Sequence, residues 1–229
     1  MRREANKKFR KKLDKENEDC LEEILLILYK AFDLKKQYEE ENIYESKKDE
    51  LWTDTELQLL DLFYSRFEDI IKATKKFIKQ EYNISLNLAN IKFKDLLYNK
   101  DEKTFEERIQ NYIEAYKTNR WNRQHCPYHM ERLLHTETTC ITYQLYKMTL
   151  DKIIEEGRFP AEEFSGGCDL CNSMGYNSGE LYRPDEIDNE PPFHPCCQCE
   201  FFPHECDEIE ARELYPEAFI EKKEMEESK

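Results

Sequence analysis

The chain has 229 residues, a formal net charge of −15 and an isoelectric point near 4.9. Its length is sufficient for one sizeable domain or two small ones. Because so acidic a chain is repelled as a whole by nucleic acid and by anionic membranes, a general affinity for either is excluded, and any contact with DNA must be local.

The N-terminal segment MRREANKKFRKK is strongly basic and leads into LDKENEDC, without the apolar stretch of a secretory signal. The nearest apolar run, LEEILLILYKAF, is too short to cross a bilayer. We therefore expect a soluble protein made in a cytosol, with no membrane partner.

The side chains of the basic N-terminal arm that are expected to contact DNA phosphates or an acidic partner surface are Arg2, Arg3, Lys7, Lys8, Arg10, Lys11 and Lys12. The alternative is that this arm is a solvated, partly disordered end.

Glycine and proline are nearly absent from the first two thirds of the chain. All five glycines lie between Gly157 and Gly179, and seven of the eight prolines lie at or after Pro160. Both residues interrupt regular elements, so long helices are expected first and a turn-rich module afterwards. Three segments before residue 120 have apolar residues at spacings of three, four and seven, which predicts three amphipathic helices. Their apolar faces contain Leu21, Ile24, Leu25, Leu28 and Phe32, then Leu60, Phe63, Phe67, Ile70 and Phe77, and then Phe105, Ile109, Tyr112 and Tyr116.

A fourth helix is expected from near Pro127 to about Gly157, since proline is tolerated in a first helical turn. Before it, the segment YNISLNLANIKF alternates loosely in polarity, but its asparagines are as typical of a loop or a helix start as of a strand. The segment after Asp207 is acidic and helix-prone, and Pro216 divides it into two pieces.

The clearest motif is Cys168-Asp-Leu-Cys171, followed after 22 intervening residues by His194 within the segment PPFHPCCQC, which also contains Cys197 and Cys199. Two pairs of Cys or His ligands separated by a loop are typical of a tetrahedral zinc site. We expect Cys168 and Cys171 to form the first pair, while His194, Cys197 and Cys199 compete for the two remaining places. The reserve ligands are Cys196, His204 and Cys206.

Several observations favour a structural zinc ion over disulfides or catalysis. In a reducing compartment, clustered thiols bind metal more readily than they form disulfides. The segment from Pro160 to Cys206 has few large apolar side chains to offset backbone entropy of about 1–2 kcal/mol per residue, whereas structural zinc contributes roughly 10–16 kcal/mol. Neither the H-E-x-x-H pattern nor the deaminase pattern H-x-E…P-C-x-x-C occurs, and no thioredoxin-like unit is apparent for a redox reading.

The expected fold class is therefore mainly α, of the α+β type. An elongated helical N-terminal region precedes a small zinc-stabilised, turn-rich module with short β-hairpins and a C-terminal helix.

A second cluster, RQHCPYHMERLLHTETTC, contains His125, Cys126, His129, His135 and Cys140. It could hold a further metal through the first three, but without a matching partner arm we favour polar residues at a helix start and a buried Cys140.

Three motifs in order resemble the phage Mu F-like minor head protein family, also called the MuF or head morphogenesis family. LLHTETTCITYQLYK is similar to the family's A-R-T-E-like helical signature, Cys168-Asp-Leu-Cys171 to its C-x-x-C, and PPFHPCCQC to its H-P-N-C-R-C. The resemblance covers roughly residues 127–206. Thr136 and Glu137 match the family, and we expect Glu137 to face the metal module as a structural hydrogen-bond partner. The departures are His135, Cys196 and Gln198, where the family favours Arg, Asn and Arg.

The resemblance implies a minor head protein in the virion, attached to the portal inside the capsid after assembly in the host cytoplasm. Its role would be head morphogenesis, with DNA packaging or ejection left open, and its partners the portal protein and other head proteins, in several copies around the portal. It implies no enzymatic activity. The expected domains are a helical region for portal or assembly contacts at 1–120, a MuF-like domain at 121–206 with the zinc module at 160–206, and an acidic helical tail at 207–229.

Two other classes of function compete with this reading. The first is a zinc-ribbon-like module acting in transcription or on nucleic acid, although acidic segments such as YRPDEIDNE flank the metal motif. The second is a metal-dependent nuclease or hydrolase, for which the sequence contains no carboxylate pair or Ser/His/Asp grouping that would support catalysis.

Overall fold

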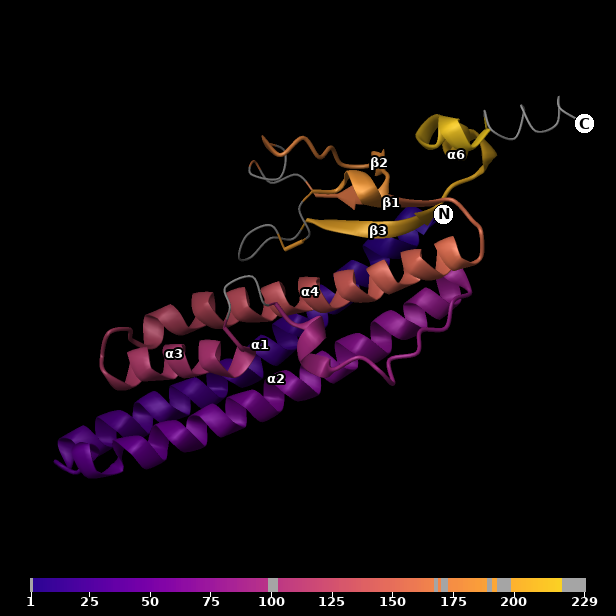
Figure 1. Cartoon of the computed structure of the whole chain (residues 1–229). Coiled ribbons are helices and arrows are strands. Elements are labelled where there is room, and N and C mark those ends of the chain that lie inside the picture. The colour runs from indigo at the N-terminus through magenta and orange to yellow at the C-terminus, as the bar shows by residue number, and fades with distance from the viewer. Residues whose placement is uncertain are drawn as a thin grey trace, which may run out of the picture.

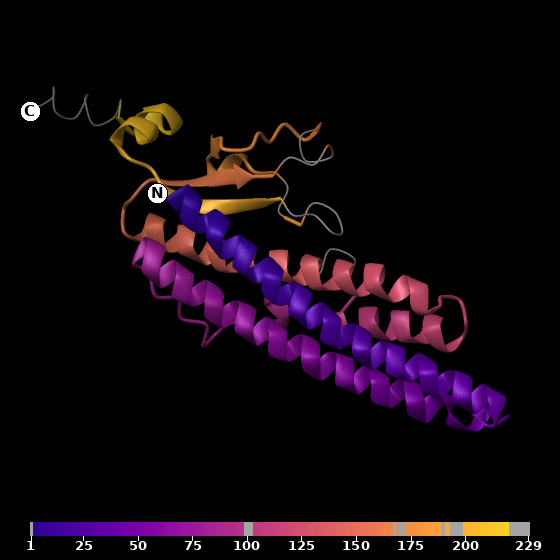
Figure 2. The same ribbon diagram turned by 180° about the vertical axis from the view of Figure 1, so that it is seen from behind.

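The longest elements of the molecule are two helices that pack against each other (Figure 1). The computed structural model describes residues 2–98, 103–166, 169, 173–188, 191–192 and 199–219, without the side chains of Arg2 and Arg3. Helices α1 (Arg2–Glu40) and α2 (Tyr44–Tyr82) run antiparallel as a hairpin. Helix α3 (Phe105–Lys117) packs beside α2, and α4 (Cys126–Glu155) packs across both α1 and α2. Seen from behind, α1 reaches from the hairpin tip to the sheet (Figure 2).

Asparagine ends the helices in the part of the chain that has no glycine. Asn42 follows α1, Asn83 caps α2 and Asn119 follows α3, with φ angles of 60°, 58° and 59°. Asn tolerates this left-handed conformation better than most residues with a side chain, because its short amide can form local hydrogen bonds. Helix α3 begins with a capping box, in which the side chains of Thr104 and Glu107 each accept a hydrogen bond from the other's backbone N–H.

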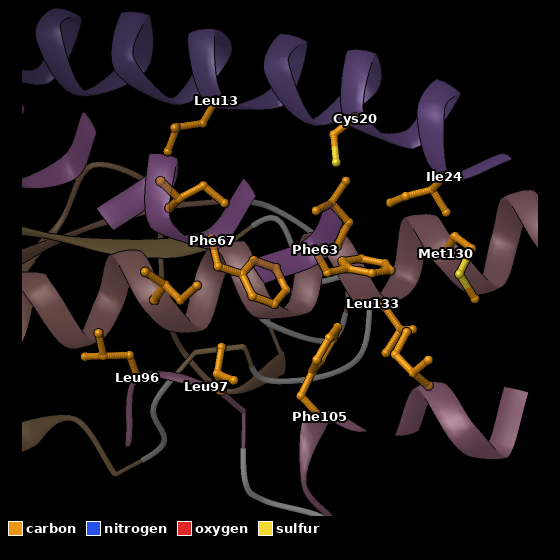
Figure 3. Packing of buried hydrophobic residues seen from close by; sticks show 14 of the residues in the cluster. Leu13, Cys20, Ile24, Phe63, Phe67, Leu96, Leu97, Phe105, Met130 and Leu133 are labelled. Atoms are coloured by element: carbon orange, nitrogen blue, oxygen red, sulfur yellow. The ribbon is translucent and has the colours of Figure 1, made fainter. Parts of the chain in front are cut away.

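One hydrophobic core joins all four long helices (Figure 3). Leu13 and Ile24 enter it from α1, Phe63 and Phe67 from α2, and Leu133 from α4. Leu96 and Leu97, at the short 3-10 helix η1 (Phe93–Leu96), close it on the side of α3. Because residues on both sides of position 120 share this core, the two expected domains pack as one body, and the division itself stays a prediction.

A small antiparallel sheet lies on α4 (Figure 1). Its strand order is β2-β1-β3, with β1 at Pro160–Ser165, β2 at Leu181–Tyr182 and β3 at Glu200–Glu205. The short 3-10 helix η3 spans Pro184–Glu186. After β3 the chain forms α6 (Glu208–Leu214), capped by Asp207, and becomes helical again at 216–219.

The mainly helical prediction is confirmed, and so are the four long helices and the interruption of the C-terminal helix at Pro216. The described part of YNISLNLANIKF contains no strand, and only its last residue belongs to η1. The reading of the basic arm as a partly disordered end is wrong, because residues 2–12 form the first turns of α1. In the described part of the chain, no helix has an apolar stretch long enough to span a bilayer.

Candidate metal site and the polar contacts around it

The strand register brings the two predicted ligand arms to the same end of the sheet. Ser165, the last residue of β1, pairs with Glu200, the first residue of β3. The arm that contains Cys168 therefore leaves the sheet where the arm that contains His194 enters it. Cys168 is three residues beyond Ser165 in the sequence. Of the five predicted ligands, those outside the described residues are Cys168, Cys171, His194 and Cys197.

Cys199 is the one predicted ligand that the structure describes, and it lies at this end of the sheet. Its side chain is buried, with 2% of the residue exposed, in a small core with the rings of Phe164, Tyr176 and Phe201. A Cβ added to Gly166 would lie 2.4 Å from the Cys199 Sγ. The thiol therefore packs directly against the backbone that leads from β1 toward Cys168, and only glycine leaves room for it.

These features fit a zinc ion. A buried thiol at the point where two Cys/His-bearing arms converge is the donor type and spacing that structural zinc prefers. Cys168 and Cys171 would hold the ion together with two of His194, Cys197 and Cys199. Among the described residues alone, no group of three or more His, Cys, Asp or Glu side chains is arranged to bind a metal.

The reserve ligands His204 and Cys206 lie at the other end of the sheet. His204 pairs with Ala161 at the start of β1, and its Nε2 atom is 2.7 Å from the Glu210 Oε2. Strand β3 separates these residues from Cys199 by roughly 17–23 Å at about 3.3 Å per residue. Burial raises the pKa of Cys206 to about 11, so its thiol stays protonated near neutral pH. The two residues therefore do not share a site with Cys199, and the third reserve, Cys196, lies outside the described residues.

Glu137, from the signature on α4, is fully buried at the junction with α3. One carboxylate oxygen forms an ion pair with Arg108 of α3, and the other accepts a hydrogen bond from the Tyr98 backbone N–H at 2.9 Å. Arg108 also donates to the Tyr98 carbonyl at 2.7 Å and to the Lys103 carbonyl at 3.1 Å. The pair thus ties α4 to α3 and to Tyr98 and Lys103, which lie between η1 and α3. That Glu137 also faces the metal arms stays a prediction.

Thr136, the second signature residue, donates to the Arg132 carbonyl at 2.7 Å and lines a cavity of about 300 Å³ beside Glu137. Arg108 lines the same cavity and was missed by the sequence reading, which did not single it out. The position of Arg108 in the sequence could have identified it. Arg108 lies three residues after Phe105 on the apolar face of α3, where a cation needs a buried partner.

The second Cys/His cluster is part of the helical core. The His129 Nδ1 atom is 3.0 Å from the Tyr116 hydroxyl, and its ring centroid lies 4.2 Å from that of Trp121 and 4.8 Å from that of Tyr112. Cys126 is fully buried, and burial raises the pKa of its thiol to about 11. These contacts support the structural reading of the cluster, and Cys140 is buried as expected.

His129 makes the stability of the fold depend on pH. Burial, followed by the charges of His125 and Arg132, lowers the pKa of His129 from 6.5 to about 4. Below pH 6.5 the unfolded chain takes up a proton that the folded chain does not, so the free energy of unfolding should fall as the pH drops from 6.5 to 4. Urea unfolding at several pH values should give a shallower decline for His129→Phe than for the wild type. Equal slopes for His129→Phe and the wild type would contradict the prediction.

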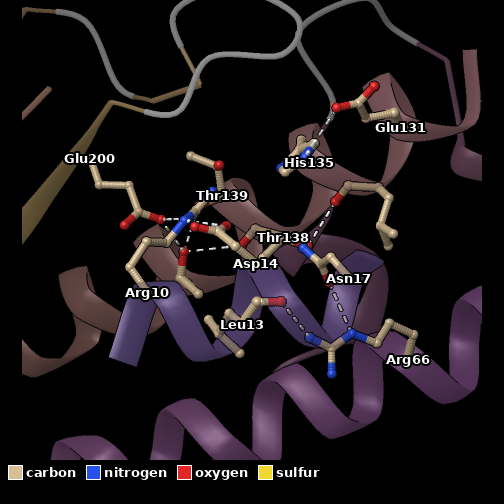
Figure 4. A network of polar contacts seen from close by, with 12 residues as sticks. Arg10, Leu13, Asp14, Asn17, Arg66, Glu131, His135, Thr138, Thr139 and Glu200 are labelled. Atoms are coloured by element: carbon tan, nitrogen blue, oxygen red, sulfur yellow. Dashed lines mark hydrogen bonds and ion pairs between the residues drawn. The ribbon is translucent and has the colours of Figure 1, made fainter. Parts of the chain in front are cut away.

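The basic arm divides into two faces. Lys7, Lys8, Lys11 and Lys12 are exposed on α1, and Lys12 lies 3.6 Å from Glu16. Arg10 points inward, with 12% of its side chain exposed, and forms ion pairs with Asp14 and Glu200 (Figure 4). The expectation that Arg10 contacts DNA or a partner surface is therefore wrong, because its guanidinium is committed to the carboxylates of Glu200 and Asp14. The side chains of Arg2 and Arg3 lie outside the described part of the chain.

Comparisons with known proteins give no match: no family model matches the chain, no curated protein is similar to it, and no solved structure resembles it. The resemblance to MuF-like proteins therefore depends on the three sequence motifs alone.

Proposed function

We propose that this chain is a phage minor head protein of the MuF type. It binds the portal inside the capsid and acts in head morphogenesis, without catalysing a reaction. A structural zinc ion, held by Cys168, Cys171 and two of the three candidates on the second arm, ties the turn-rich module together. The long helices carry the contacts with the portal and with other head proteins.

The observation that supports this proposal most strongly is the register of β1 and β3. Two of the three motifs behind the resemblance lie about 25 residues apart, and pairing of Ser165 with Glu200 brings the chain segments that carry them to one end of the sheet. The third motif lies on α4, the helix that carries the sheet. The chain segments that lead to two of the motifs and the helix that carries the third thus belong to one packed unit, which is what a shared structural role would need.

The zinc proposal is tested on the purified full chain. We expect about one zinc ion per chain by elemental mass spectrometry, and loss of this zinc in the double variant Cys168→Ser/Cys171→Ser. Cys20→Ala is the matched control, because Cys20 is a buried cysteine of the helical core. It should keep the zinc. A folded wild-type protein with no bound metal and with freely titrating thiols would contradict the proposal.

The virion proposal is tested by quantitative proteomics of purified particles. We expect the chain at a few copies per portal ring, and we expect it to copurify with the portal when capsids are disrupted. Its absence from particles of a phage that encodes it would contradict a minor head protein and would leave a role outside the virion.

A further inference from the structure

An ion pair fastens the start of β3 to the helices (Figure 4). The Arg10 Nη1 of α1 pairs with the Glu200 Oε1, and the two side chains are 12% and 4% exposed. The same Glu200 oxygen accepts a hydrogen bond from the Thr142 hydroxyl of α4 at 3.1 Å. The Arg10 Nε lies 2.9 Å from the Asp14 Oδ1, one helical turn along α1. Three elements distant in sequence, α1, α4 and β3, therefore meet at Glu200.

Glu200 directly follows Cys199, and the side chains of the two residues lie on opposite faces of the strand. Side chains alternate between the faces of a β-strand, so Glu200 and Phe202 share one face, and Cys199 and Phe201 share the other. Phe202 belongs to the helical core, where its ring packs against that of Tyr146. Cys199 and Phe201 belong to the small aromatic core. The ion pair thus holds one face of the strand at the residue next to a metal-ligand candidate.

We propose that Arg10 and Glu200 are positioning residues for the metal site: their ion pair fixes the register and facing of β3, so that the Cys199 thiol points toward the arm of Cys168 and Cys171. The proposal rests on the proposed zinc site. It gives the N-terminal part of α1 a role in a site that lies about 190 residues away in the sequence.

The chemistry of a buried ion pair supports a role in register. Replacing such a pair by apolar side chains of similar size is often neutral or stabilising, so stability alone does not require charges at these two positions. Buried charges do, however, make a wrong strand register energetically unfavourable. A slip of β3 by one residue would turn Glu200 away from Arg10 and leave both charges buried without each other, and it would turn Cys199 toward the helices.

The test uses the full chain loaded with Co²⁺ as a probe of the metal site. The double variant Arg10→Met/Glu200→Met removes both charges and keeps the side-chain volume. Thr142 keeps its acceptors, because it also donates to the Thr138 and Thr139 carbonyls at 3.0 Å. The buried Asp14 Oδ1 loses its Arg10 partner, so some loss of stability is expected, as in the control variant below. We expect a wild-type circular dichroism spectrum, at least tenfold weaker Co²⁺ binding, and a changed Co²⁺ absorption band in the visible region.

Arg66→Met is the matched control. Arg66 is also a buried arginine that bonds to α1, through Asn17, Glu16 and the Leu13 carbonyl (Figure 4), but it has no contact with β3 in the described structure. It should lower stability and keep the wild-type Co²⁺ affinity and spectrum. Wild-type Co²⁺ binding by the double variant, or equal losses in both variants, would overturn the positioning role. A wild-type protein that gives no tetrahedral Co²⁺ spectrum would overturn the zinc site itself.

Discussion

Replacing Glu137 by alanine should lower the free energy of unfolding by about 3–5 kcal/mol, the usual result of removing one partner from a buried ion pair. Glu137 is fully buried, and Arg108 is almost so. Removing the carboxylate leaves the guanidinium in a low-dielectric site without its counter-charge, although the Tyr98 and Lys103 carbonyls still accept from it, and it also removes the acceptor of the Tyr98 N–H. Equilibrium unfolding in urea, monitored by circular dichroism, measures the loss.

The double variant Arg108→Met/Glu137→Leu distinguishes the cost of an unpaired charge from the value of the pair. Because both charges are removed together, we expect it to recover most of the stability that Glu137→Ala loses. A double variant as unstable as the single one would show that the hydrogen bonds to the segment at Tyr98 contribute more than the ion pair. A loss below about 1 kcal/mol in Glu137→Ala would contradict the buried geometry.

Phe67→Ala should also lower the free energy of unfolding by about 3–5 kcal/mol, as expected for truncation of a core aromatic residue. The Phe67 ring is fully buried at the centre of the helical core, with its centroid 5.1 Å from that of Phe105, 5.8 Å from Phe63 and 6.4 Å from Phe93. These rings come from α2, α3 and η1, so a cavity here removes packing on three elements at once. Urea unfolding provides the measurement.

Leu57→Ala on the same helix is the matched control for Phe67→Ala. Leu57 is 60% exposed, and its truncation should change the free energy of unfolding by less than about 0.5 kcal/mol. Phe67→Leu should lie between the two, because it leaves a smaller cavity. Similar losses for Phe67→Ala and Leu57→Ala would show that the core is not packed around Phe67.

Apolar periodicity predicted the existence of the helices, but it underestimated α1. The apolar face was visible from Leu21 onward, whereas α1 begins at Arg2, because two positions of its buried face are asparagines. Asn17 donates to the Thr138 hydroxyl at 3.0 Å and accepts from the Arg66 Nε at 2.9 Å, and Asn6 lies 3.4 Å from the Tyr82 hydroxyl. Polar residues that are buried because distant partners satisfy them look like surface residues in a sequence.

The candidate site was predictable to a similar extent. Ligand types and local spacing are properties of short segments, so Cys168-x-x-Cys171 and the second arm could be read directly. The pairing of Ser165 with Glu200, the packing of Cys199 against Gly166 and the contact of Arg10 with Glu200 depend on how distant segments meet. No local sequence pattern indicates which distant segments contact one another.

The core shared across position 120 has a practical consequence for anyone dissecting the molecule. A fragment that starts at residue 121 would carry α4 without α1 and α2, and would present the apolar side chains of Leu133, Leu134 and Ile141 to water. Such a fragment is prone to aggregate or to self-associate through that stripe. Expression of the motif-bearing part from residue 121 by itself would therefore report on an artefact of truncation, and biochemical work on the cysteines should retain the helical hairpin.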